Sequence, residues 1–211
     1  MKYKIIFIFL LSTSLQAALL IEPYAGYAGI RGKSEFDYED GVSYNFWYLK
    51  SQTQLAGGRL GYQMPVIGLM LGIDYTYQPN HKIKAYREPN QTFTFLGEDT
   101  PSYVYYVRTN HVGLFAGVDL PILLRAWASY YYSNMRVTGS QSPMVLVDGD
   151  TFEGRGFGFG IGFKLIPFTS INFEYRRFKY GDHKPQGQDY NYHINKRTTE
   201  FMATLSIPLV L

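Results

Sequence analysis

The chain has no cysteine among its 211 residues. Disulfide scaffolds, thiol catalysis and cysteine-ligated metal sites are therefore excluded. A strong excess of charge is also missing, because the formal net charge is only +3, and Lys2 and Lys4 lie in a segment that we expect to be removed. A balance this small gives no basis for a nucleic-acid partner.

Long apolar runs are missing beyond the N-terminus. That end carries two lysines, an apolar segment from Ile5 to Leu11, and small residues at Ala17 and Ala18. The apolar segment is far shorter than the ~20 residues that a membrane-spanning helix needs, and this order of features is typical of a secretory signal peptide. We predict a signal peptide over residues 1–17, with cleavage at Ala17 or Ala18, and one domain over residues 18–211. If the mature chain enters a membrane, it does so as strands.

Glycine and aromatic residues are abundant, with 21 glycines, 20 tyrosines and 15 phenylalanines. Over residues 154–163, glycine occupies every second position. A phosphate-binding loop needs irregular glycine spacing and a helix after it, whereas period two is the pattern of a β-strand. The stretch is therefore predicted to be a strand with one bare face and one large apolar face.

Prolines divide the chain into hairpins. Pro65, Pro121 and Pro167 each lie between two runs of alternating residues, and proline belongs at a turn because it has no N–H to give to a ladder. A run in which Pro23 marks an edge or a local irregularity, and a C-terminal run from Phe201, bring the prediction to about eight strands. Long polar connections are expected on the other side, at roughly residues 33–52, 79–102, 136–153 and 181–196.

Alternation alone fits both a soluble barrel of lipocalin type and a membrane barrel. The polar faces consist largely of Gly, Ser, Thr and Gln, which suits a narrow lumen of about eight strands better than a solvated exterior. We therefore place the apolar face toward lipid. The lipid-facing residues are predicted to include Phe157, Phe159, Ile161, Phe163, Leu69, Leu71 and Ile73. The expected interfacial girdle consists of Tyr75, Tyr77, Tyr103, Tyr105, Tyr130, Tyr132, Tyr175 and Tyr180.

In its strand alternation, its turns at Pro65, Pro121 and Pro167, and its last strand, the mature chain resembles the small eight-stranded outer-membrane barrels of the OmpA transmembrane-domain and OmpX type. The resemblance implies an all-β, closed, antiparallel up-and-down transmembrane barrel in the bacterial outer membrane, with both termini and the proline turns in the periplasm. It also implies insertion by the barrel-assembly machinery, which reads a C-terminal strand ending in an aromatic residue. Here Leu211 stands at that position.

Charged residues on the predicted inner face define a candidate site in the lumen. They are Arg59, Asp74, Asp119, Arg125, Lys164, Glu174, Arg176 and Glu200. The hairpins bring together Arg59 with Asp74, Asp119 with Arg125, and Arg176 with Glu200. Buried charges must pair, so we interpret the set as a structural plug; the alternative is a polar path for small solutes.

The predicted role is structural or interactive, through the long extracellular loops. Possible contacts with anionic lipopolysaccharide are His81, Lys82, Lys84 and Arg87. Other expected partners are membrane lipids and an unidentified extracellular molecule. The alternatives are a narrow passive channel for small solutes and, third, a lipid A-directed enzyme. His111 is the only histidine within a predicted strand, with Ser129 as a possible neighbour; a lone histidine in a polar lumen is more often structural, so we predict no enzyme and no catalytic, cofactor or metal residues.

Overall fold

The computed structural model describes residues 18–38, 45–64, 68–87, 103–120, 123–140, 146–166, 168–184 and 192–211. In these ranges the chain forms β1 (Ala18–Tyr38), β2 (Asn45–Met64), β3 (Leu69–Arg87), β4 (Tyr103–Asp119), β5 (Leu124–Ser140), β6 (Thr151–Ile166), β7 (Thr169–Lys184), β8 (Tyr192–Ser206) and β9 (Leu209–Val210). The predicted signal peptide and Pro65, Pro121 and Pro167 lie outside the described residues. Within the described part, no helix is long and apolar enough to cross a membrane.

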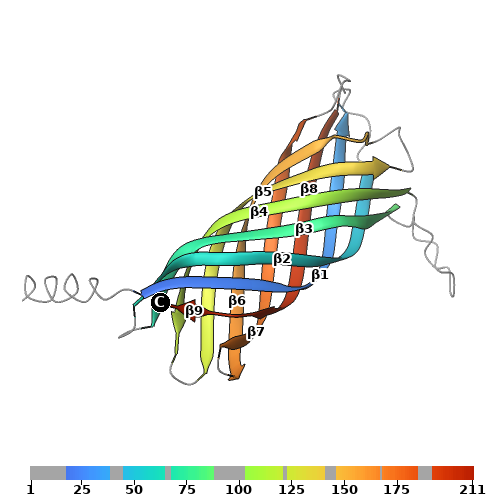
Figure 1. Ribbon diagram of the computed structural model, residues 1–211. Helices are drawn as coiled ribbons and strands as arrows, with labels where there is room; N and C mark the ends of the chain where they lie inside the picture. Colours follow the sequence, from blue (N-terminus) through green and yellow to red (C-terminus); the bar gives the residue numbers. More distant parts are fainter. Residues whose placement is uncertain are drawn as a thin grey trace, which may run out of the picture.

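The strands form one closed antiparallel barrel (Figure 1). Each of β2 to β8 pairs with its neighbour in sequence, β8 pairs with β1, and β1 also pairs with β2, which closes the ring. The short β9 follows β8 after Pro208 and pairs with Leu20 and Ile21 at the start of β1. The prediction of an all-β, up-and-down barrel of about eight strands is confirmed.

Pro23 marks an irregularity rather than an edge. On one side β1 pairs continuously with β2, and Pro23 lies opposite Gly58. On the other side the partner of β1 changes from β8, whose pairing ends at Tyr24, to β9, whose pairing includes Ile21. The proline, which lacks an N–H, therefore occurs where the ladder changes partner.

The strands are longer than predicted. β1 continues to Tyr38, β2 already begins at Asn45, and β3 continues to Arg87. Much of the sequence that was expected to form loops therefore belongs to the barrel wall. In these outer segments many of the lumen-facing side chains are apolar and many of the outward ones are charged, so their alternation has the opposite polarity to that of the segments with exposed apolar residues. For the same reason part of the predicted girdle is wrong: Tyr103, Tyr105 and Tyr180 are buried inside the barrel.

The two faces of the wall are arranged as the pattern predicts. Phe157, Phe159, Ile161 and Phe163 point outward, as do Leu71 and Ile73, with Leu69 partly exposed. The glycines between the phenylalanines face the lumen, where they make room for large groups on neighbouring strands. A Cβ at Gly160 would lie 2.2 Å from the ring of Trp127, so only glycine fits beside that indole.

The lumen at the long-loop end contains an apolar core that the sequence pattern did not predict. This core consists of Leu49, Ile83, Ala85, Tyr103, Tyr105, Val107, Tyr131, Met135, Val137, Leu146, Phe152, Phe178 and Tyr180. Leu146 comes from the connection between β5 and β6, which is held by backbone hydrogen bonds from Val137 N to Asp150 O (2.8 Å) and from Gly149 N to Val137 O (2.9 Å). Packed aromatic and aliphatic side chains therefore occupy the lumen at this end of the barrel.

Candidate functional site

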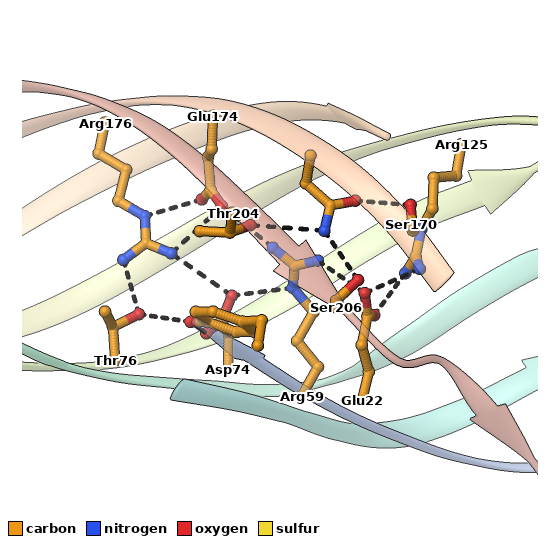
Figure 2. A network of polar contacts seen from close by, with 12 residues as sticks. Glu22, Arg59, Asp74, Thr76, Arg125, Ser170, Glu174, Arg176, Thr204 and Ser206 are labelled. Carbon is orange, nitrogen blue, oxygen red and sulfur yellow. Dashed lines mark hydrogen bonds and ion pairs between the residues drawn. The ribbon is translucent and has the colours of Figure 1, made fainter. Parts of the chain in front are cut away.

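A network of arginines and carboxylates crosses the middle of the lumen (Figure 2). Arg59 on β2 donates from Nε to Asp74 on β3 (3.0 Å) and from Nη2 to Glu174 on β7 (3.0 Å). Its Nη1 also lies 3.6 Å from Glu22 on β1. One guanidinium thus connects β2 to both of its neighbours, β1 and β3, and to β7 across the lumen.

Arg176 on β7 completes the centre of this network. It donates to Glu174 from Nε (2.8 Å) and Nη2 (3.2 Å), and from Nη1 to the hydroxyl of Thr76 (2.8 Å). Two tyrosines add neutral donors. The hydroxyl of Tyr24 donates to Asp74 (2.6 Å), and that of Tyr131 contacts both Glu174 (2.8 Å) and Asp74 (3.0 Å). The carboxylates are therefore fully engaged, as buried charges require.

Aromatic rings fill the space beside these guanidinium groups. Arg59 lies 4.1 Å from the ring centroid of Trp127, and Arg176 lies 4.3 Å from that of Tyr131. Both distances are within the range of cation–π contacts. Both arginines are buried, so side chains pack closely against them in this layer of the lumen.

All eight predicted lumen charges lie on the inward face of the barrel, and the strand register places each of the three predicted pairs opposite one another, but only Arg59 and Asp74 form a direct ion pair. Asp119 and Arg125 are opposite in register, yet Arg125 pairs with Glu22, and Asp119 pairs with Lys164. Arg176 and Glu200 are also opposite, but Arg176 binds Glu174 instead. Long arginine side chains reach past their cross-strand neighbour to carboxylates elsewhere in the lumen.

Glu22 is a member of the network that sequence reasoning missed. It is fully buried, and Arg59 and Arg125 both contact it. The signal was present, since Glu22 shares its strand face with Leu20 and Tyr24, which are also buried. Apolar residues occur at both sets of alternating positions in this segment, so the sequence alone does not show which set points inward.

The predicted surface contacts are only partly on the surface. His81 is buried, and its Nδ1 lies 2.9 Å from the carbonyl oxygen of Pro79. Lys82 and Lys84 are exposed on β3 rather than in a loop, and the side chain of Arg87 lies outside the described part of the structure.

Glu200 and His111 lie close to each other beside the arginine network. Glu200 accepts from Gln78 (3.0 Å) and lies 3.6 Å from Nε2 of His111, whose ring stacks on Phe178 at 4.4 Å. Ser129 is not beside His111; the residue opposite His111 on β5 is Ser133. Among the described residues, no three His, Cys, Asp or Glu side chains are grouped so that they could hold a metal ion.

Lys196 is buried in the apolar core at the long-loop end. It lies beyond Phe201, the last apolar outward residue of β8, and thus outside the band of exposed apolar residues. Its Nζ has no hydrogen-bond partner within the described part of the chain and lies 3.5 Å from the ring centroid of Phe152. Burial lowers the pKa of Lys196 from its usual 10.5 to about 7, and the nearby carboxylate of Asp150 opposes this shift.

Basic side chains surround the outside of the barrel just beyond its apolar band. On β6 Phe157 is followed outward by Arg155, and on β7 Tyr175 is followed by Arg177. Every strand from β1 to β8 carries at least one such residue. We call this set the basic belt: Arg31, Lys33, Lys50, Lys82, Lys84, Arg108, Arg136, Arg155, Arg177, Lys179 and Arg197.

Like charges are directly opposed within the basic belt. Lys50 lies between Arg31 on β1 and Lys84 on β3, and Arg108 lies opposite Arg136. Directly opposed like charges destabilise a sheet. Among the described residues of these outward segments, Glu35 and Glu153 are acidic, so positive charge predominates there. The arrangement is thus suited to anions supplied from outside the chain.

Comparison with known proteins identifies the fold. No family model and no curated protein matches the chain. It is similar to the outer membrane protein OprG from Pseudomonas aeruginosa, with 9% identity, a TM-score of 0.58, and coverage of 92% of this chain and 97% of that one. Neisserial surface protein A (NspA) matches at 16% identity, TM-score 0.45 and coverage of 90% and 96%. Ail of Yersinia pestis, solved in complex with the heparin analogue sucrose octasulfate, matches at 10% identity, TM-score 0.46 and coverage of 90% and 99%.

Proposed function

Since the chain is, by its fold, a small eight-stranded β-barrel of the outer-membrane type, we propose that it is a bacterial outer-membrane protein with a surface-interaction role, and that its basic belt binds the phosphate groups of lipopolysaccharide. The long-loop end faces the cell exterior, and both termini face the periplasm. The main support for this proposal is the basic belt on the outside of the barrel.

The position of the belt supports lipid phosphate as its ligand. An outer-membrane barrel presents an apolar band to hydrocarbon, flanked by interfacial residues at both ends. In this chain Tyr75, Tyr130 and Tyr132 are exposed at one margin of the band, and the belt lies farther along the same strands. Cations at that depth meet the phosphorylated sugars of the outer leaflet, and charge-assisted hydrogen bonds to phosphate are strong.

The interior supports a surface role over a channel. The arginine–carboxylate network fills the middle of the lumen, and the apolar core containing Phe152 and Phe178 fills the long-loop end. A barrel of about eight strands has an interior only wide enough for side chains. The passive channel therefore remains the second candidate, and a lipid A-directed enzyme the third.

The proposal is tested by the stability of the purified barrel in detergent with and without lipopolysaccharide. A ligand that binds only the folded state stabilises it by mass action, so the midpoint of urea unfolding should rise with bis-phosphorylated lipid A and rise less with the dephosphorylated form. Added salt should weaken the effect because it screens exposed charges. Equal midpoints with both lipids would refute phosphate recognition. A change in the mass of cellular lipid A on expression would favour the enzyme instead.

A further inference from the structure

One part of the basic belt differs from the rest because the surface beneath it is hollow. A cavity of about 740 Å³ lies on the outside of the wall, across β1, β2 and β3. Its polar lining consists of Arg31, Lys50, Ser51, Gln52, Lys82 and Lys84. Three of these cations, Arg31, Lys50 and Lys84, stand in one row across the strands. We call them the groove row.

The wall itself is irregular at this place. The ladder between β2 and β3 holds from Trp47 to Ser51, then resumes only at Ala56, which lies opposite Tyr77. The hydroxyl of Ser51 donates to the carbonyl oxygen of Lys82 (2.8 Å) beside the interruption. An interrupted ladder leaves backbone groups available for partners other than the neighbouring strand. A hydrogen-bonding headgroup would meet such groups at the base of the cavity.

A second, apolar cavity adjoins the first on the membrane side. It measures about 450 Å³, and it shares Gly29, Gln52 and Phe201 with the basic cavity. Its remaining lining includes Tyr27, Phe173 and Ala203 on the lipid-facing side of β1, β7 and β8. A basic hollow continuous with an apolar one fits a molecule with an anionic head and hydrocarbon tails, and it does not fit a free phosphate equally well.

We propose that these two cavities form a specific binding site for one phosphorylated glycolipid of the lipid A class. The groove row holds a headgroup phosphate, Ser51 and Gln52 contact the sugar, and acyl chains lie against Tyr27, Phe173 and Phe201. The inference rests on the proposed function, and it adds that the belt contains one preferred site rather than a uniform ring of charge.

The test compares two triple variants that remove equal charge. The first is Arg31→Gln/Lys50→Gln/Lys84→Gln in the groove row. The second is Lys33→Gln/Lys179→Gln/Arg197→Gln, a row on the opposed positions of β1, β7 and β8, where the ladders run without a register shift. Binding of bis-phosphorylated lipid A to each purified barrel in detergent is measured by native mass spectrometry, and the unheated gel mobility verifies folding.

We expect the groove-row variant to lose affinity by at least about tenfold, since it removes the charge-assisted contacts to the phosphate. The control variant should lose no more than about threefold, because it weakens only the general field. Equal losses in both variants would overturn the specific site and leave the proposed function standing. Unchanged affinity in both would overturn the two together. Competition by soluble glucosamine phosphate as effective as that by lipid A would replace the lipid with a free sugar phosphate and so overturn the proposal.

Discussion

The guanidinium of Arg125 donates two hydrogen bonds to the carboxylate of Glu22, with Nη1–Oε1 and Nη2–Oε2 distances of 2.8 and 2.5 Å. The two residues are 103 positions apart, on β5 and β1, which lie across the ring from each other in the order of strands. Both side chains are buried. The pair therefore connects opposite walls of the barrel and occupies the lumen between them.

Removing one member of this pair should destabilise the barrel more than removing both. Glu22→Leu leaves the Arg125 guanidinium with an uncompensated buried charge, and loss of one partner of such a pair costs about 3–5 kcal/mol. The double variant Glu22→Leu/Arg125→Met should recover much of that loss, because apolar groups can replace a buried pair. Urea unfolding in detergent measures both; a double variant as unstable as the sum of the two singles would contradict the pairing.

Enlarging Gly160 should damage the barrel through Trp127. A Cβ at this position would lie 2.2 Å from the indole ring, so Gly160→Ala should lower the urea midpoint, and Gly160→Ala/Trp127→Leu should restore part of it. Gly29→Ala is the matched control, since nothing lies within 4 Å of a Cβ built there. Heat-dependent gel mobility and urea unfolding of all three variants provide the comparison. Equal effects at Gly160 and Gly29 would show that the indole does not limit the first position.

Burial of Lys196 should make the stability depend on pH. Its pKa is about 7 in the folded barrel and 10.5 in the ordinary state, so between these pH values the unfolded chain binds more protons, and the free energy of unfolding rises with pH. Lys196→Met should therefore stabilise the barrel most at pH 7 and below, and its advantage should shrink toward pH 10.5, by about 1.4 kcal/mol for each unit of pKa difference.

The measurement is urea unfolding of the wild type and of Lys196→Met over this range, with the exposed Lys82→Met as a control for the loss of a lysine. A constant difference between wild type and Lys196→Met at every pH would contradict the burial of an unpartnered amine.

The sequence was sufficient for the barrel and insufficient for its interior. Period-two alternation, as in residues 154–163, fixes which residues of a strand share a face, and the large outward Phe159 and the lumen-facing Gly160 follow from it. Contacts across the lumen do not follow, because alternation specifies neighbours in the wall only. The sequence therefore predicts Asp119 as the neighbour of Arg125, which the register confirms, but it does not predict the ion pair with Glu22 on the far side.

The sequence predicts loops for the outer segments of the strands because polarity reverses there. Beyond the apolar band the exposed residues are Lys and Arg, as in Lys82 and Lys84, while Ile83 and Ala85 face inward. A pattern that requires apolar residues on the outer face therefore ends the predicted strand at that point. The same reversal conceals the basic belt, since its members are far apart in sequence and come together only when the ring closes.

We propose that side chains seal the lumen and that the protein acts through its outer surface, and conductance in a planar bilayer tests this proposal most directly. Side chains of the arginine–carboxylate network occupy the middle of the lumen, and those of the apolar core occupy its long-loop end. A barrel of about eight strands has little further room inside. The purified wild type is predicted to give no steady current, and Arg176→Ala, which removes a buried guanidinium at the centre of the network, to give at most brief openings. Steady, ion-selective currents from the wild type would contradict the account and establish the channel instead.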